Sequence, residues 1–315
     1  MGRWATAVAA CLAAAALSSA PAGAVQGGTP DGDAHPYVGM AMFYAHGAPL
    51  ERCSGTLLSA TTFVTAGHCA GFDADTGETP DHAEVWFGAG PIPRGDYPGG
   101  GVSCAGYTGY PCKGDVGGTP HAHAGWTGSL TRADSHDIGV VVLDGRGWEL
   151  DTYAQVAPKG YLDTLATARG KQSVSFAVVG YGVQFERPNF EVAVRERYVG
   201  TTQLVDLRSA LADGYQVVMS DSGGNGTGGG GICFGDSGGP VFHGEYLVAD
   251  ISSGTKYCSG KSAAYRLDQD TARSFLSSYL RFPKYARAPR RVAAACRCSS
   301  ARYEDRTSGP EKTEP

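Results

Sequence analysis

The stretch Gly235-Asp236-Ser237-Gly238-Gly239-Pro240 carries the sharpest signal in this sequence. A serine hydroxyl is a poor nucleophile until a neighbouring base takes its proton. The flanking glycines let the backbone approach a bound molecule and turn its N–H groups toward it. We expect the amides of Gly235 and Ser237 to form an oxyanion hole, where charge develops in a transition state. Six residues in this order are uncommon in an ordinary loop, so we interpret Ser237 as a nucleophile.

A histidine upstream supplies a candidate base. In the stretch Thr65-Ala66-Gly67-His68-Cys69, a predicted strand delivers His68 beside a cysteine that can anchor it. Histidine titrates near neutral pH, so it can act first as a general base and then as a general acid. Taken alone, His68 could be a packed structural residue. The serine motif downstream favours the catalytic interpretation.

A carboxylate before a buried strand completes the candidate set. Asp137 directly precedes the apolar run 138–143. A carboxylate on the far side of an imidazole fixes its tautomer and stabilises the imidazolium. Asp134 is the alternative candidate for this carboxylate, and Asp137 is preferred because it directly precedes the apolar run. A lone aspartate before a strand is usually a turn residue, so this assignment depends on His68 and Ser237.

The composition indicates many turns and short strands. The chain has 315 residues, 42% hydrophobic and 18% charged, which is enough apolar material for one large core or two small ones. The 47 glycines and the few stretches of helical periodicity favour strands. A formal net charge of -5 is mild and gives no sign of a nucleic-acid partner.

Runs rich in β-branched and aromatic residues are the strand candidates. They are residues 55–58, 62–65, 138–143, 174–179, 215–219, 240–242 and 246–251. Residues 271–280 have helical spacing, and Asp270 stands before them as an expected N-cap. Two further stretches, 70–120 and 222–231, are rich in turn-forming residues and are interpreted as loops.

The first residues predict an export signal, 1–24. Arg3 supplies a positive start, residues 5–17 form an apolar run too short to span a bilayer comfortably, and Ala22-Gly23-Ala24 offers a cleavage pattern of small residues. The alternative is a buried N-terminal helix. No other segment is apolar enough to cross a membrane, so we expect a secreted, extracellular protein.

The cysteine count agrees with export. Of nine cysteines, Cys11 lies in the signal and eight follow it, an even number that suggests disulfide bonds. A metal site is the alternative, but no CxxC or HExxH pattern supports one. Cys104 and Cys112 are near neighbours, and we expect them to pair. Cys296 and Cys298 are too close for an easy bridge, so free, intermolecular and absent states stay open.

The order His, Asp, Ser, with these three motifs, resembles the trypsin/chymotrypsin family of serine endopeptidases. The likeness covers most of residues 25–280. Four other stretches match the family's pattern: Val25-Gln26-Gly27-Gly28 resembles its mature N-terminus, Cys53-Ser54-Gly55-Thr56-Leu57 a cysteine-bearing strand, Gly180-Tyr181-Gly182 a Gly-Trp-Gly turn, and Ser252-Ser253-Gly254 a substrate-binding Ser-Trp-Gly strand. Tyr181 and Ser253 replace the family's tryptophans.

The resemblance implies an all-β fold of two packed six-stranded antiparallel β-barrels with a C-terminal helix, within a domain of residues 25–282. The polar tail, 283–315, is expected not to pack. The active site would lie in a cleft, with His68 and Asp137 from the first barrel and Ser237 from the second. The implied disulfides are Cys53–Cys69 and Cys233–Cys258. A free amine at Val25 would pair with Asp236 and order the oxyanion hole.

The resemblance also locates a specificity pocket. Gly231 would lie at its base, and Ser252 and Gly254 would bind the substrate. Because Gly231 carries no charge, and the second wall near Ala263 and Ala264 is small and neutral, we expect the pocket to favour apolar or aromatic residues. Asp221 is the alternative source of charge, if its side chain turns inward.

Two other functions remain open. One is a protease-fold binding protein that has lost activity, since a fold does not guarantee function. The other is an α/β-hydrolase esterase, whose Gly-x-Ser-x-Gly pattern is present, but whose triad runs in the order Ser, acid, His. We expect protein or peptide substrates, possible protein inhibitors, a monomer, and no nucleic-acid or membrane partner.

Two clusters suggest metals weakly. His121, His123, Asp134 and His136 are scattered loop residues, which are more often solvated than metal-bound. Asp73-x-Asp75-x-Gly77-Glu78 has an incomplete calcium-loop spacing, although some family members bind calcium near this point. We therefore expect no metal and no cofactor.

Overall fold

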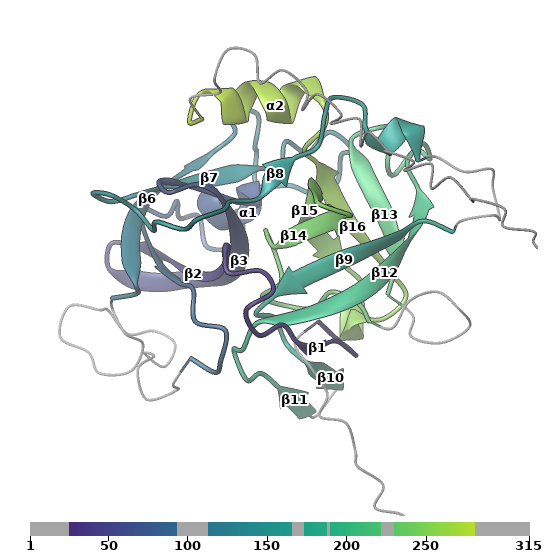
Figure 1. Ribbon diagram of the computed structural model, residues 1–315. Coiled ribbons are helices and arrows are strands. Elements are labelled where there is room, and N and C mark those ends of the chain that lie inside the picture. Colours follow the sequence, from purple (N-terminus) through teal and green to yellow (C-terminus); the bar gives the residue numbers. More distant parts are fainter. Residues whose placement is uncertain (1–24, 93–112, 166–172, 188–189, 222–229, 281–315) are drawn as a thin grey trace, which may run out of the picture. The chain divides into compact units, whose positions relative to one another are not determined.

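Six antiparallel strands close into a first barrel (Figure 1). In this computed structural model, which describes residues 25–92, 113–165, 173–187, 190–221 and 230–280, they are β2 (Val38–Ala45), β3 (Ala48–Ser59), β4 (Thr62–Thr65), β5 (His82–Trp86), β6 (Val116–Ala122) and β7 (Gly139–Leu143). They pair in the order β2-β3-β4-β7-β6-β5, and β5 pairs with β2 to close the ring. Closure leaves no free strand edge.

Six further strands form the second barrel: β9 (Ser175–Gly180), β12 (Tyr198–Asp206), β13 (Gln216–Ser220), β14 (Pro240–His243), β15 (Tyr246–Gly254) and β16 (Lys261–Arg266). They pair in the order β9-β12-β13-β16-β15-β14, and β14 pairs with β9 to close the ring. The prediction of an all-β fold with two six-stranded antiparallel barrels is confirmed.

Shorter elements complete the described chain. Strands β1 (Thr29–Pro30) and β8 (Gln155–Val156) attach to β12 and β15, and β10 (Phe185–Arg187) pairs with β11 (Phe190–Val192). The helices are α1 (Gly67–Ala70), α2 (Asp270–Ser277) and the 3-10 turns η2 (Leu162–Thr164) and η3 (Lys256–Cys258). Among the described residues, no helix has the length and apolar character needed to cross a bilayer.

Two sequence expectations need correction. The interpretation of residues 70–120 as loop is wrong for β5 and for most of β6, which lie inside that stretch. β6 is hard to predict because it contains two glycines and Pro120; Gly118 is needed there, since a Cβ would lie 2.7 Å from the Val142 carbonyl oxygen. In α2, Asp270 is the first helical residue, and Gln269 is the N-cap.

Several expectations concern residues outside the described ranges. They are the export signal 1–24, the Cys104–Cys112 pair, most of the loop 222–231, and the tail with Cys296 and Cys298.

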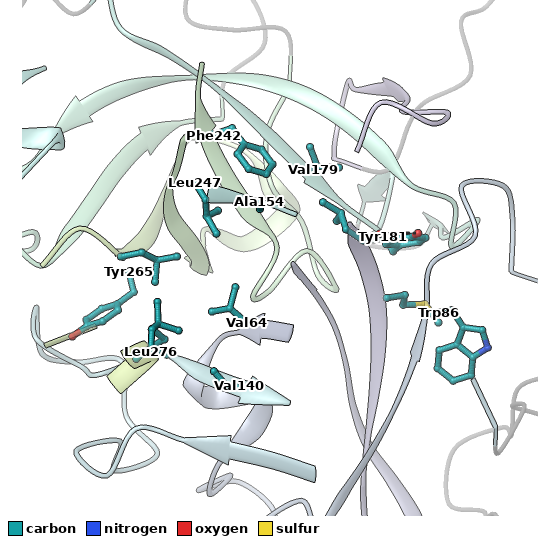
Figure 2. Close-up of a cluster of buried hydrophobic side chains, with 14 of the residues drawn as sticks. Val64, Trp86, Val140, Ala154, Val179, Tyr181, Phe242, Leu247, Tyr265 and Leu276 are labelled. Atoms are coloured by element: carbon teal, nitrogen blue, oxygen red, sulfur yellow. Dashed lines mark hydrogen bonds between the residues drawn. The ribbon is translucent and has the colours of Figure 1, made fainter. Parts of the chain in front are cut away.

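A continuous cluster of buried side chains lies between the barrels (Figure 2). Val64 and Val140 come from the first barrel, and Phe242 and Leu247 come from the second. Leu276 of α2 packs against the same cluster, so the helix covers apolar surface that both barrels contribute. Such burial is the main favourable term for holding two packed units together.

A buried arginine joins the barrels through polar contacts. Arg197, just before β12, is 1% exposed and donates from Nε to the carboxylate of Asp31 at 2.9 Å. Its other nitrogens donate to the carbonyl oxygens of Gly32 at 2.6 Å, Val38 at 3.1 Å and Phe87 at 3.0 Å. One side chain thus satisfies acceptors from the N-terminal segment and from the first barrel.

We predict that Arg197→Leu lowers the free energy of unfolding by about 3–5 kcal/mol, because it removes the arginine from the buried carboxylate of Asp31, which then keeps only its contacts with His35 among the described residues. Urea unfolding followed by fluorescence measures the change. Arg146→Leu is the matched control, since Arg146 pairs with Glu149 on the surface, where both side chains are exposed. Equal midpoints for the two variants would contradict a structural role for Arg197.

Candidate active site

His68 and Asp137 meet because their strands pair. His68 lies in α1, directly after β4, and Asp137 lies just before β7; β4 and β7 are antiparallel neighbours, with Thr65 opposite Gly139. The His68 Nδ1 atom lies 3.0 Å from each carboxylate oxygen of Asp137, and the His68 backbone N–H donates to Oδ1 at 2.7 Å. This contact assigns the proton to Nδ1 and leaves Nε2 as the basic nitrogen.

The surroundings make His68 a strong base. Burial lowers the pKa of the imidazole, but the charge and hydrogen bond of Asp137 raise it, with further help from Glu51 and Asp73, to about 9. The carboxylate of Asp137 is fully buried. A proton accepted at Nε2 is therefore stabilised by a fixed negative charge across the ring.

A serine of the second barrel also binds Asp137. Ser252, on β15, donates its hydroxyl to Asp137 Oδ2 at 2.6 Å. The family resemblance predicts that Ser252 binds substrate through its backbone. No sequence pattern indicates the contact between its side chain and Asp137. The carboxylate thus accepts hydrogen bonds from both barrels.

The turn that carries Ser237 is held against β3 by Ser54. The backbone N–H of Ser54 donates to the Ser237 carbonyl oxygen at 2.8 Å, and the Ser54 hydroxyl donates to the Gly235 carbonyl oxygen at 2.8 Å. The neighbouring Cys53 is bonded to Cys69, the residue after His68. These links bring the Ser237 turn and His68 to the middle of β3.

Ser237 itself is half-buried. Within the described residues, no hydrogen bond joins its hydroxyl to His68. In unliganded sites such hydrogen bonds are often long, and they tighten when substrate binds. The structure therefore brings His68 and Asp137 into direct contact and places Ser237 nearby on the turn that Ser54 holds.

Two backbone N–H groups of this turn donate no hydrogen bond within the described residues. The N–H groups of Asp236, Gly238 and Gly239 donate to backbone carbonyls. Those of Gly235 and Ser237 donate no hydrogen bond to any described residue, so both are available to a negatively charged oxygen.

Backbone conformation and close contacts explain the glycines that flank Asp236 and Ser237. Gly235 and Gly238 have φ values of +91° and +73°, which favour glycine. A Cβ at Gly235 would lie 2.8 Å from the guanidinium of Arg52, and one at Gly238 would lie 2.6 Å from the Ala66 nitrogen. A side chain at Gly238 would therefore push the turn away from the first barrel, whereas at Gly235 the Arg52 side chain could move and the positive φ is the constraint.

Asp236 points into the protein and is fully buried. Its carboxylate accepts from the N–H groups of Gly182 at 2.8 Å and Cys233 at 2.9 Å. Burial raises its pKa to about 7, although these two hydrogen bonds and Arg52 oppose the shift. Cys233 is bonded to Cys258, so the segment before Asp236 is tied to η3, which follows β15.

Val25 is buried, with no exposed surface, in the core of the second barrel. The next residue, Gln26, forms an antiparallel bridge with Gly231, whose N–H donates to its carbonyl oxygen at 2.8 Å. No contact joins Val25 to Asp236 within the described residues. In this chain the nitrogen of Val25 is a neutral amide, since Ala24 precedes it.

The expected pocket residues have a charged neighbour. A Cβ at Gly231 would lie 2.9 Å from the Asp221 Cα, so Asp221 occupies the space beside this glycine. Asp221 is 4% exposed and accepts from the Ser262 hydroxyl at 2.7 Å. Burial raises its pKa to about 6, so it holds a proton more readily than an ordinary aspartate. A Cβ added at Gly254, another expected pocket residue, would lie 3.7 Å from the apolar side chain of Ile232.

Three of the possible metal ligands, His123, Asp134 and His136, lie together, and the His136 Nδ1 atom lies 3.1 Å from a carboxylate oxygen of Asp134. The rings of His123 and His136 stack, with centroids 4.6 Å apart, and Asp134 accepts from Tyr265. The ring of His121 lies beside that of Tyr279. Asp73 accepts hydrogen bonds from the N–H of Asp75 and the hydroxyl of Thr76 within its own turn.

Among the described residues, one group could hold a metal by distance: Glu51, Cys53, His68 and Cys69. Its two sulfurs are bonded to each other and offer no thiolate, so they cannot ligate a metal as cysteines usually do.

Residues 121–269 match the family model described as Trypsin, a range that includes Asp137 and Ser237 and begins after His68. No curated protein sequence matches the chain. A solved structure of HL collagenase is 14% identical with a TM-score of 0.53, and the match covers 79% of this chain and 95% of the collagenase. A Glu endopeptidase solved in complex with MPD is 11% identical with a TM-score of 0.49, over 80% of this chain and 93% of that one.

At 14% identity the collagenase likeness concerns the fold, and it extends over most of this chain. The Trypsin match concerns the sequence, and it includes the strands that follow Asp137 and Ser237. Together they confirm the resemblance to the trypsin/chymotrypsin family of serine endopeptidases, because the chain has a trypsin-family sequence region within a chymotrypsin-like two-barrel fold.

Proposed function

We propose that this chain is a secreted serine endopeptidase that hydrolyses peptide bonds through an acyl-enzyme on Ser237. The observation that carries the proposal is the pair of unoccupied amides at Gly235 and Ser237, on a turn that Ser54 fastens beside the His68–Asp137 pair. A nucleophile, a base with its orienting carboxylate, and an oxyanion site are the parts that acyl transfer requires.

The reaction proceeds in two halves. Ser237 Oγ attacks the scissile carbonyl carbon while His68 Nε2 takes its proton, and the amides of Gly235 and Ser237 bind the resulting oxyanion. The C–N bond then breaks as His68 returns the proton to the leaving amine, and the acyl group stays on Ser237. Water attacks the ester with His68 again as base, and the new acid leaves as Ser237 regains its proton.

Export and partners follow from the same proposal. The disulfides Cys53–Cys69 and Cys233–Cys258 agree with an oxidising compartment, which the expected signal 1–24 would reach. Substrates would be proteins or peptides, protein inhibitors are possible, and the enzyme would act as a monomer without a metal or cofactor. The competing function is an inactive binding protein of the same fold, which active-site labelling separates from an enzyme.

Activation would come from a new N-terminus at Val25. The buried carboxylate of Asp236 has no cation bonded to it among the described residues, and Val25 is already buried on the bridge from Gln26 to Gly231. An ammonium at Val25 would supply a charge partner and hold Asp236 ionised. Cleavage after Ala24 by signal peptidase would create that amine without a separate activating protease.

The specificity pocket would be neutral and would favour apolar or aromatic residues before the scissile bond. Gly231 offers no charge of its own, and the hydrogen bond from Ser262 engages one oxygen of Asp221. Ile232 faces Gly254 with an apolar surface, and burial of an apolar side chain there is favourable by roughly 1.5–3 kcal/mol. Phe, Tyr, Leu and Met are the expected preferences.

We predict that a sulfonyl fluoride reagent adds once, at Ser237, and abolishes hydrolysis, because this hydroxyl alone adjoins a base and an oxyanion site. Ser237→Ala should lose roughly 10⁴-fold or more in kcat/KM while keeping its fold. Ser277→Ala, an exposed serine on α2, is the control and should react as the wild type does. Adduct mapping by mass spectrometry decides, and modification elsewhere would overturn the assignment.

We predict that active protein begins at Val25. A form that retains Ala24 should be about tenfold or more less active in kcat/KM, because it lacks the ammonium for Asp236. Asp236→Asn in the processed form should lose activity similarly. N-terminal sequencing of the secreted enzyme and kinetics on both forms are the measurements. Full activity with Ala24 in place would refute this route of activation.

We predict that matched peptides with Phe or Leu before the scissile bond are cleaved faster than those with Arg or Lys, since Gly231 carries no charge and the neighbouring carboxylate of Asp221 is held by Ser262. Asp221→Asn should leave this ranking unchanged. A tenfold preference for Arg in kcat/KM, about 1.4 kcal/mol of transition-state free energy, would show that the neutral-pocket proposal is wrong.

A further inference from the structure

A cavity of about 380 Å³ borders His68 on the first barrel. Strand β3 contributes Leu50 and Glu51 to its walls. The loop after α1 contributes residues 72–75, and the loop after β6 contributes Trp126, Gly128 and Leu130. It contains none of the residues assigned to the specificity pocket, Gly231, Ser252 and Gly254. A group bound here would touch the imidazole and lie outside that pocket.

One part of the lining is apolar and exposed. Phe72 and Leu130 are 43% and 39% exposed, which is unusual for large apolar side chains in the described chain. Trp126 donates from its indole nitrogen to the Phe72 carbonyl oxygen at 2.9 Å, which holds the aromatic wall in place. Exposed apolar surface inside a cavity is a common mark of a binding site.

The other part is anionic. Glu51, Asp73 and Asp75 line the cavity, and none of its described lining residues is a lysine or arginine. The Glu51 carboxylate lies within 4.8 Å of a ring nitrogen of His68. Burial raises the pKa of Glu51, His68 opposes the shift, and Asp73 and Asp137 add to it. A cation entering the cavity would therefore meet a partly desolvated carboxylate, where charge pairs interact more strongly than in water.

We propose that this cavity is a subsite that binds a lysine or arginine side chain of the polypeptide substrate, with the cation beside Glu51 and the aliphatic stem against Trp126 and Phe72. The proposal rests on the peptidase function proposed above. Long basic side chains combine an apolar stem with a charged end, and aromatic faces attract cations. Because the cavity borders His68, the basic residue lies within two positions of the scissile bond.

The test is a peptide library randomised at two positions on each side of the scissile bond. The expected result is enrichment of Lys and Arg at one position outside the specificity pocket. At that position, a lysine peptide should exceed its norleucine counterpart by about fivefold or more in kcat/KM, and the ratio should fall in 0.5 M salt, since screening weakens charge pairs.

Glu51→Gln should reduce this lysine-to-norleucine ratio toward one. The ratio cancels the effect that Glu51 has on His68 before a peptide binds, because both peptides meet the same free enzyme. Asp151→Asn is the control: it removes the same charge from an exposed carboxylate outside the cavity, and it should keep the wild-type ratio. A fluorescent lysine peptide bound to Ser237→Ala, measured by anisotropy with and without Glu51→Gln, gives a readout independent of turnover.

The outcomes separate the two proposals. Absence of both cleavage and Ser237 labelling would reject the peptidase function, and the subsite with it. Cleavage without enrichment of Lys or Arg, or enrichment that Glu51→Gln leaves intact, would reject the subsite alone.

Discussion

The buried carboxylate of Asp137 is the interaction on which the candidate site depends. It accepts hydrogen bonds from the backbone and ring of His68 in the first barrel and from the hydroxyl of Ser252 in the second. A buried charge is costly unless hydrogen bonds satisfy it, so these donors must stay in position whenever Asp137 is ionised. The donors are placed by the pairing of β4 with β7 and by β15, and the site therefore inherits its geometry from the strand register of both barrels.

A buried carboxylate in the second barrel, Asp250, differs from Asp137 in its surroundings. Asp250, two residues before Ser252, is 1% exposed, and neither side-chain oxygen has a hydrogen-bond partner among the described residues. Burial, together with the nearby charge of Asp137, raises its pKa well above the usual value. Asp250 therefore retains its proton more readily than an ordinary aspartate, and it lacks the hydrogen-bond donors that surround the carboxylate of Asp137.

The sequence was sufficient for features that depend on local patterns. The motifs around His68, Asp137 and Ser237 are contiguous, and runs of β-branched residues such as β4 appear at the predicted positions. Sequence patterns did not predict the features that depend on contacts between distant segments of the chain. β6 forms despite its glycines and Pro120 because barrel closure supplies partners on both sides. The hydroxyl contacts of Ser54 and Ser252, and the approach of Glu51 to His68, join segments far apart in the chain, and no spacing rule indicates them.

Two carboxylates of the acidic cavity also act on the candidate catalytic base, His68. Glu51 and Asp73 line the cavity and also contribute to the raised pKa of His68. Without a bound cation, the imidazole favours its protonated form near neutral pH, and a protonated His68 cannot accept the Ser237 proton. A basic side chain beside Glu51 would neutralise part of this field and lower the pKa of His68 toward neutrality. In this arrangement, binding of the substrate's own charge would release the base that the reaction needs, so recognition at the cavity and proton transfer at Nε2 are coupled through the same carboxylates.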